Sequence, residues 1–157
     1  MPVKSKQTIY LETSVISAYF DFWGKSPKQK QETRKFWREI LPKYNAVISS
    51  VTLVELQEAK PLWRIQYLKF IDHIKNVKLS DQTIELTKKY IKQGIIPKSK
   101  RDDATHLAMA VVNKMDFFLT WNMQHFLRPN KLKQISDFNR KNNLHSPILI
   151  KPSYFFE

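Results

Sequence analysis

The sequence predicts an α/β fold with a mainly parallel central sheet, and two observations lead to this fold class. Short runs of β-branched and aromatic residues alternate with longer segments of helical composition along the whole chain. Such alternation is typical of parallel strands that are joined by crossover helices. The chain has 157 residues and contains neither an internal repeat nor a low-complexity linker. We therefore expect a single domain that covers residues 1–157.

The predicted strands are short apolar runs bounded by polar or turn-forming residues. In chain order they cover residues 8–11, 46–49, 76–80, 116–121 and 148–150. The sequences TIYL, AVIS and ILI are rich in β-branched side chains, and DFFLTW is rich in aromatic ones. Both kinds of side chain favour extended backbone.

The predicted helices follow from apolar spacing and from residues that start or stop a helix. In chain order they cover residues 14–21, 28–41, 51–59, 61–73, 81–93 and 103–113. Pro42 ends the second helix, and Ser50 is a suitable N-cap for the third. Gly94 stops the fifth helix. In the sixth, Leu107 and Val111 lie on one apolar stripe that faces the sheet.

The chain carries a strong positive charge, with 27 Lys and Arg residues against 14 Asp and Glu residues and a formal net charge of +13. A field of this sign favours a polyanionic partner, most simply a nucleic acid. The alternative is a host whose proteins are generally rich in lysine.

Residues that the sequence lacks exclude several classes of protein. Without cysteine, the chain has no disulfide, zinc–thiolate site or cysteine nucleophile. With Gly24 and Gly94 as its two glycines, it cannot form a Gly-rich phosphate loop. The N-terminal MPVKSKQTIY has no apolar segment like that of a signal peptide, and no run approaches the roughly 18 apolar residues of a membrane span. We therefore expect a cytoplasmic protein with no membrane partner.

Several acidic and amide side chains are expected at one edge of the sheet. Glu12 follows the first strand, Glu55 lies in the helix after the second, and Asn122 follows the fourth. In a parallel sheet the carboxyl ends of strands and the starts of the following helices share one edge, where ligands bind. Asp103 reaches this edge by a longer route, through the start of its helix. Converging carboxylates repel one another, and an oxygen-liganded Mg²⁺ or Mn²⁺ relieves that repulsion.

Each of these residues also has an ordinary alternative. Glu12 could pair with a Lys or Arg, and Glu55 could be a solvated helix residue. Asp102 and Asp103 stand where capping and the helix dipole favour acids, and Asn122 is a natural N-cap for the short MQHF turn. Their joint placement at one edge favours the metal-site hypothesis.

Helical spacing distinguishes the two adjacent aspartates. Asp103 precedes Leu107 by four residues and so heads the stripe that faces the sheet, which makes it the better ligand. Asp102 heads the row that contains His106, nearer the flank, and is expected to cap the helix or to support its neighbour. His106 and His125 could contact phosphate, but packed or hydrogen-bonding roles are expected for both.

Four segments resemble the PIN domain, the nuclease fold of VapC-type toxins in toxin–antitoxin modules. They occur in the family's order, cover nearly the whole chain, and read IYLETSVISAYF, SSVTLVELQEA, RDDATHLAMAVVNKMDFFLTWNMQHF and SPILIKP. The pattern DATHLAMA followed by LTWNMQHF is the most specific part, and the ETS and TWN variants resemble one branch of the family. The resemblance implies a PIN-like three-layer α-β-α sandwich with a mainly parallel central sheet.

The resemblance also implies a metal-dependent endoribonuclease, the toxin of a type II module, that uses Mg²⁺ or Mn²⁺ to hydrolyse RNA phosphodiester bonds. Its metal ligands are expected to be Glu12, Glu55 and Asp103, with Asn122 as a fourth catalytic residue where many members have Asp. The resemblance further implies that hydroxyl groups support the site, at positions Thr13 and Ser14. Glu in place of Asp at position 12 adds a methylene, and Asn at position 122 removes a charge that would help to hold a second metal ion.

Partners follow from charge and from the resemblance. Basic side chains on either side of the acids are expected to hold the RNA backbone, namely Lys98, Lys100, Arg101, Arg128, Lys131 and Lys133. Phe22 and Trp23 are possible stacking platforms for bases, with core packing as the alternative. A cognate antitoxin would cover the acidic cleft. A homodimer is expected, with Phe36, Trp37 and Trp63 as contact residues or, alternatively, as core residues.

Three other functions compete with the ribonuclease hypothesis. A non-catalytic RNA-binding protein could retain this fold and its basic surface. A phosphoacceptor signalling domain also gathers acids at strand ends, but the first strand here supplies no acidic pair. A DNA nuclease would use the same phosphodiester chemistry.

Overall fold

A computed structural model of the chain describes residues 5–157 and contains a five-stranded sheet in the order β3-β2-β1-β4-β5. Every neighbouring pair of strands is parallel. The strands are β1 (Thr8–Leu11), β2 (Asn45–Ser49), β3 (Lys75–Val77), β4 (Phe117–Leu119) and β5 (Ile148–Ile150). The predicted α/β class and parallel sheet are therefore confirmed.

Helices connect consecutive strands, as parallel pairing requires. They are α1 (Thr13–Phe20), α2 (Pro27–Glu39), α3 (Ser50–Gln57), α4 (Pro61–Ile71), α5 (Asp81–Lys92), α6 (Arg101–Val112) and α7 (Pro129–Lys141). Short helical turns cover Leu41–Lys43, Lys98–Lys100, Met123–Leu127 and Pro152–Phe156. No helix within residues 5–157 is both long and apolar enough to cross a membrane.

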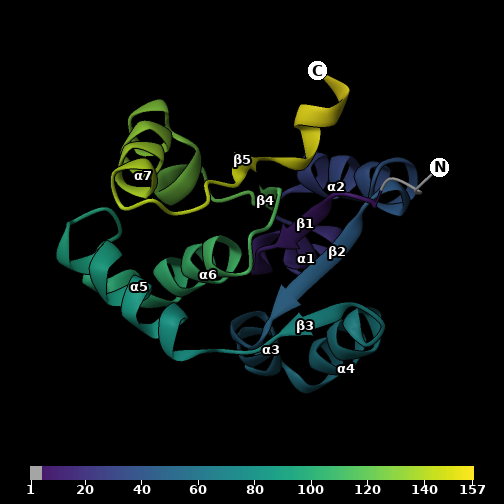
Figure 1. The fold of residues 1–157 in the computed structure, drawn as a ribbon. Helices are drawn as coiled ribbons and strands as arrows, with labels where there is room; N and C mark the ends of the chain where they lie inside the picture. The colour runs from purple at the N-terminus through teal and green to yellow at the C-terminus, as the bar shows by residue number, and fades with distance from the viewer. Residues whose placement is uncertain (1–4) are drawn as a thin grey trace.

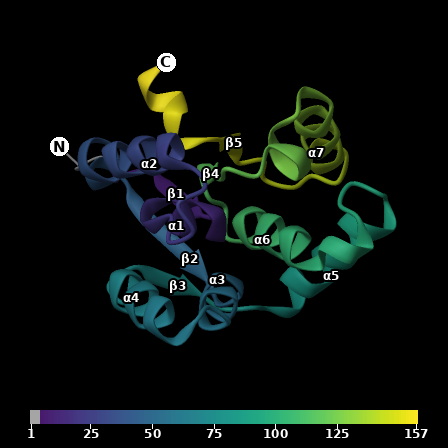
Figure 2. The ribbon, with the colours of Figure 1, turned by 180° about the vertical axis from the view of Figure 1, so that it is seen from behind.

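The helices form layers on both faces of the sheet, as Figures 1 and 2 show. Strand residues alternate between the faces: Tyr10 and Phe118 pack with α5, α6 and α7, whereas Leu11 and Leu119 pack with α1, α2 and α4. Each face therefore has its own apolar core, and the sheet separates them. This arrangement is the predicted three-layer α-β-α sandwich.

Most predicted elements are present, with differences at their ends and one helix that we did not predict. The third strand lies at Lys75–Val77 rather than at residues 76–80. The N-cap of α3 is Ser49 rather than Ser50, because the Ser49 hydroxyl accepts a hydrogen bond from the Val51 amide at 3.2 Å. Gly94 has a φ of +73°, which confirms it as the stop after α5. The additional helix is α7, whose Lys- and Asn-rich sequence has few apolar positions.

Two other expectations concern the N-terminal segment and the aromatic residues proposed for a dimer contact. The segment MPVKSKQTIY, in which we predicted no signal peptide, begins in residues 1–4, outside the described part of the chain. Phe36 is fully buried, so for this residue the core alternative is correct and the expected dimer contact is wrong. Trp37 and Trp63 are half-buried within the same core.

The order of the strands singles out the boundary between β1 and β4. From β1 the chain moves outward through β2 to β3, and it then returns to β4 on the other side of β1 before continuing to β5. Open α/β sheets bind ligands where the strand order reverses, at the carboxyl ends of the strands. Glu12 directly follows β1, and Thr120 directly follows β4.

The stability of the sheet is expected to depend strongly on Phe118. Its buried ring stacks on Tyr10 with centroids 5.4 Å apart and contacts Phe126 at 4.8 Å. We expect Phe118→Ala to lower the free energy of unfolding by about 3–5 kcal/mol, because it leaves a cavity in the core. Tyr154→Ala, at a side chain that is 54% exposed, should change it by less than about 0.5 kcal/mol. Urea denaturation measures both; equal losses would contradict this packing.

Candidate functional site

Glu12 is held at the junction of β1 and α1. Its carboxylate accepts hydrogen bonds from the Ser14 amide at 2.9 Å, the Ser14 hydroxyl at 2.5 Å and the Thr120 hydroxyl at 2.5 Å. The side chain is only 5% exposed and caps the N-terminus of α1, where the helix dipole favours a negative charge. Among the described residues no Lys or Arg forms an ion pair with Glu12, so the alternative of a basic partner is wrong.

The same two hydroxyl groups also tie the end of β4 to Glu12. The Ser14 hydroxyl accepts a hydrogen bond from the Trp121 amide at 2.9 Å, and the Thr120 hydroxyl accepts one from the Asn122 amide at 2.9 Å. Each hydroxyl can therefore donate its proton to the carboxylate. The backbone that follows β4 is thus fixed relative to the acid that follows β1.

Glu55 projects from α3 toward the start of α1 and toward α6. Its Oε1 accepts a hydrogen bond from the Thr13 hydroxyl at 2.8 Å and also contacts His106 Nε2. Burial alone would raise the pKa of Glu55, but the hydrogen bond and charge of His106, together with the Thr13 hydrogen bond, hold it below its ordinary value. Glu55 is therefore a carboxylate at neutral pH, and the alternative that it is merely a solvated helix residue is wrong.

Asp103 lies in the first turn of α6 and contacts the segment after β4. Its Oδ2 lies 2.5 Å from His125 Nδ1 and accepts a hydrogen bond from the Asn122 amide group at 3.3 Å. Asn122 Oδ1 in turn accepts the His125 backbone amide at 3.0 Å, so Asn122 caps the MQHF turn as the ordinary alternative expected. One amide side chain thus performs both tasks, capping the turn and contacting Asp103.

His106 is the fully buried centre of this cluster. Its Nδ1 lies 2.6 Å from the Tyr10 hydroxyl, and that hydroxyl lies 2.7 Å from the Ser49 hydroxyl. Burial would lower the pKa of His106, but the Glu55 hydrogen bond and the charges of Glu12, Glu55 and Asp103 raise it above its ordinary value. An imidazolium satisfies every partner, because it donates to Glu55 and to Tyr10, and Tyr10 then donates to Ser49.

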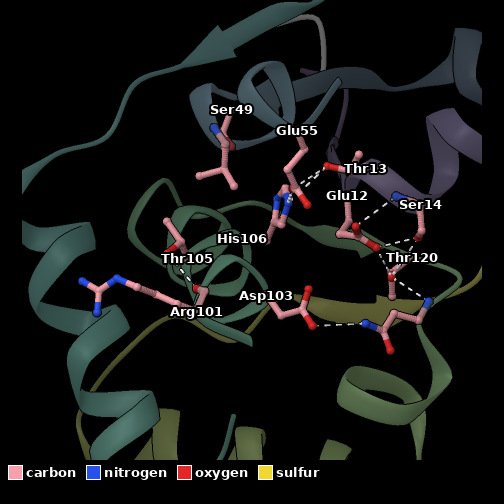
Figure 3. Close-up of polar contacts among 12 residues, drawn as sticks. Glu12, Thr13, Ser14, Ser49, Glu55, Arg101, Asp103, Thr105, His106 and Thr120 are labelled. Atoms are coloured by element: carbon pink, nitrogen blue, oxygen red, sulfur yellow. Dashed lines mark hydrogen bonds and ion pairs between the residues drawn. The ribbon is translucent and has the colours of Figure 1, made fainter. Parts of the chain in front are cut away.

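The three acids come from different elements and point into one region. Figure 3 shows Glu12, Glu55 and Asp103 around a shared space, with His106 beside Glu55. Within residues 5–157 the hydrogen bonds reach Oε1 of Glu55 and Oδ2 of Asp103, and none reaches the second oxygen of either carboxylate. Glu12 accepts three hydrogen bonds of the roughly four that a carboxylate can take. Each acid therefore retains capacity for a further ligand.

These donors fit a hard divalent cation by their chemistry, although they are not arranged around one. As the side chains stand, no three His, Cys, Asp or Glu residues among residues 5–157 form a group that could hold a metal ion. Carboxylate oxygens without a Lys or Arg partner are nevertheless what Mg²⁺ and Mn²⁺ prefer. Glu55 and Asp103 are partly exposed and retain free oxygens, so side-chain rotation could bring them to a shared ion, whereas Glu12 is fixed.

The supporting residues predicted from the sequence divide into those that reach the cluster and one that does not. Thr13 and Ser14 hydrogen-bond to Glu55 and Glu12 respectively, as the resemblance implied. Asp102 is exposed, lies in the first turn of α6, and makes no side-chain hydrogen bond among those of the described residues. The structure therefore does not bring Asp102 into the cluster.

The six basic residues that were expected to bind the RNA backbone differ in their exposure and in their contacts within the protein. Lys98 and Lys100 are exposed in the turn before α6, Arg101 is exposed as the first residue of α6, and Arg128 is exposed directly before α7. Lys131 instead donates a hydrogen bond to the Ile95 carbonyl, and Lys133 lies 4.0 Å from the Asp137 carboxylate. Lys131 is therefore anchored to a backbone carbonyl, and Lys133 has an acid nearby, but both retain their positive charge.

Sequence reasoning missed several residues that complete the site. Thr120 and Tyr10 were each read only as part of a predicted strand. His106 and His125 were expected to be packed or hydrogen-bonded, which is correct, but their carboxylate partners were not foreseen. For Thr120 a signal existed, because a hydroxyl residue at the carboxyl end of a central strand faces the edge where Glu12 lies.

Solved structures of VapC and VapBC proteins share this fold. VapBC2 from Rickettsia felis bound to a DNA fragment from its promoter is 17% identical, with 92% of this chain and 98% of that chain covered and a TM-score of 0.59. VapBC-1 from nontypeable Haemophilus influenzae is 13% identical, with 94% and 99% covered and a TM-score of 0.62. VapC20 from Mycobacterium tuberculosis, a sarcin-ricin loop cleaving toxin, is 12% identical, with 74% and 92% covered and a TM-score of 0.55.

These similarities establish the PIN-like fold that the sequence predicted. No protein-family model matches the chain, and no curated protein sequence matches it significantly. The assignment to the branch with ETS and TWN variants stays a prediction.

The hydroxyl group of Thr120 should matter for stability. Thr120→Val removes a donor to the buried Glu12 carboxylate, so we expect the free energy of unfolding to fall by about 1–3 kcal/mol. Thr105→Val is a matched control, because the buried Thr105 hydroxyl donates only to the Arg101 carbonyl of its own helix. Chemical denaturation should show the larger loss for Thr120→Val; a loss no larger than that of the control would contradict this role.

The His106–Glu55 pair should make stability depend on pH. The raised pKa of His106 contributes stability below the unfolded value of 6.5, and this contribution is lost as pH rises through the folded value. The lowered pKa of Glu55 contributes above the unfolded value of 4.5 and is lost as pH falls through the folded value. Their joint contribution is therefore largest between these two unfolded values.

We expect the unfolding free energy, measured in EDTA, to fall between pH 6 and pH 9 more steeply in the wild type than in His106→Gln. His73→Gln removes an exposed histidine and should keep the wild-type slope. Identical slopes in the wild type and His106→Gln would show that the pair does not form as described.

Proposed function

We propose that the protein is a metal-dependent endoribonuclease that hydrolyses RNA phosphodiester bonds, and that it acts as the toxin of a type II toxin–antitoxin module. One observation carries the proposal. Three carboxylates from separate elements, Glu12, Glu55 and Asp103, face one region beside the strand-order reversal, and none of them has a Lys or Arg partner among the described residues. Such a concentration of negative charge in a protein of net charge +13 needs a functional explanation.

A divalent cation is the explanation that best suits these donors. Glu55 and Asp103 would hold it with their free oxygens, and Glu12 with its remaining acceptor capacity. When bound, Mg²⁺ or Mn²⁺ supplies Lewis-acid activation of water and charge stabilisation at the phosphate.

The protein's own residues would orient the reactants. Asp103, held by His125, is placed to orient or deprotonate a water molecule. Asn122 already donates to Asp103 and offers a neutral amide that can also donate to a phosphate oxygen. Ser14 and Thr120 fix Glu12, whereas Thr13 and His106 hold one oxygen of Glu55 and leave its other oxygen to turn toward the ion.

The surface charge supports an RNA substrate. Lys98 and Lys100 precede α6, Arg101 is its first residue, and all three side chains are exposed. Because Asp103 lies in the first turn of the same helix, an RNA backbone bound by these cations would pass beside the acids. Cationic surfaces of this kind bind polyanions and speed their encounter.

The solved structures of similar fold support the finer assignment. VapC20 is described as a toxin that cleaves the sarcin-ricin loop, which favours RNA over DNA as the substrate. The R. felis and H. influenzae structures are VapBC complexes, which supports a cognate antitoxin for this chain. We propose that such an antitoxin covers the acidic region with a cationic side chain, and that the toxin forms a homodimer.

The test replaces acids by their amides. We expect Glu55→Gln and Asp103→Asn each to lower Mg²⁺- or Mn²⁺-dependent cleavage of a defined RNA pool by at least about 100-fold while the protein remains folded, because each removes a charged ligand. Glu58→Gln and Asp72→Asn change exposed acids outside the cluster and should retain wild-type cleavage. Gel-resolved cleavage with and without metal measures the effect, and circular dichroism checks the fold.

Undiminished cleavage in both cluster variants would reject the assignment of these acids. A wild-type protein that binds RNA but cleaves none of it with either metal would instead identify a non-catalytic RNA-binding protein.

A further inference from the structure

A groove of about 550 Å³ adjoins the acidic cluster. Ser14 and Asn122 belong to its lining, and these residues contact Glu12 and Asp103. Trp23 and Lys25 belong to the same lining, with Trp121 also in the wall. The volume lies within the roughly 300–1,000 Å³ that is usual for small-molecule sites, so the groove can hold a nucleotide.

Trp23 is presented to solvent by a tightly bonded loop. Its side chain is 64% exposed, although most tryptophans are largely buried. Asp21 adopts a left-handed conformation with a φ of +45°, and its carboxylate accepts the Lys25 amide at 3.1 Å and the Ser26 amide at 3.0 Å. The Gly24 amide donates to the Asp21 carbonyl at 2.8 Å. The loop is therefore fixed before any ligand binds, which reduces the entropy lost on binding.

Trp23 packs against one other aromatic ring among the described residues, that of Trp63. It meets Trp63 edge-on, with centroids 4.8 Å apart and an interplanar angle of 83°. Phe22, the other predicted platform, is stacked on Trp63 at 5.2 Å and belongs to the core, so for Phe22 the core alternative is correct. Trp23 alone combines a fixed position with a large accessible aromatic surface.

Two lysines bring positive charge to Trp23. The Lys60 ammonium lies 4.4 Å from the centroid of the Trp23 ring, and the Lys25 ammonium lies 5.5 Å from it. Within residues 5–157, neither lysine forms an ion pair with an acid. Both ammonium groups lie over the Trp23 ring in cation–π contacts, so a stacking base would displace one of them from the ring face and leave it to pair with the adjoining phosphate.

We propose that Trp23 is a base-stacking subsite for single-stranded RNA, with Lys25 and Lys60 binding the phosphate next to the stacked base. The inference rests on the proposed ribonuclease function and deepens it, because it names unpaired RNA as the substrate class. In an A-form duplex the bases are stacked on one another and cannot reach an aromatic side chain, whereas an unpaired base can.

The experiment measures binding separately from cleavage. Fluorescence anisotropy in EDTA would give the Kd of the full chain for a labelled uridine hexamer and for an abasic ribose-phosphate hexamer of the same length. We expect Trp23→Ala to weaken binding of the uridine hexamer about 5- to 100-fold, which is the range for loss of one stacked base, and to leave abasic binding unchanged. Trp23→Phe should retain most of the affinity. Tyr154→Ala, at an exposed aromatic residue outside the groove, should retain all of it.

Several results would overturn the subsite. Equal affinities of Trp23→Ala and the wild type for the uridine hexamer would do so, as would an equal loss for the abasic hexamer. Unchanged RNA affinity with a lower mass of Trp23→Ala in analytical ultracentrifugation would instead identify a protein interface. In each case, metal-dependent cleavage by the wild type would leave the proposed function standing. If the wild type neither cleaves RNA nor binds either hexamer, both proposals fail.

Discussion

The repulsion among three carboxylates is the constraint on which the rest of this site depends. Glu12, Glu55 and Asp103 face a common region (Figure 3), and Glu55 and Asp103 contact histidines rather than Lys or Arg. Hydroxyl groups and a helix N-terminus fix Glu12, and the Thr13 hydroxyl and the buried His106 hold one oxygen of Glu55. Because these groups orient the charges without neutralising all of them, we propose that the cluster binds a cation.

The fold imposes this arrangement through its topology. The reversal of strand order between β1 and β4 leaves room at the edge of the sheet, and the residues that follow both strands meet there. A groove beside the cluster is lined by Ser14 and Asn122, which contact the acids, and also by Trp23 and Lys25 of an ordered loop. We propose that an RNA strand binds along this groove.

Features that depend on local pattern and connectivity could be predicted from the sequence. Glu12 and Asn122 each follow a predicted strand, and this position correctly indicated that both lie at one edge of the sheet. Gly94 correctly indicated where a helix ends. Contacts between distant residues could not be predicted in this way. The pairing of His106 with Glu55 and Tyr10 depends on how α3, α6 and β1 pack together. Residues that orient the acids were therefore missed. Helix α7 was missed although its sequence carries a local signal, since Leu132, Ile135 and Phe138 recur every three residues after Pro129.

The central claim is that the three carboxylates can form one divalent-ion site. Anomalous diffraction from crystals grown with Mn²⁺ tests it most directly, because the ion's position is recorded independently of any activity. The account predicts a single strong peak within about 2.0–2.4 Å of oxygens from Glu55 and Asp103, with Glu12 as a direct or water-mediated partner. A peak elsewhere on the protein, or no peak at a saturating Mn²⁺ concentration, would contradict it.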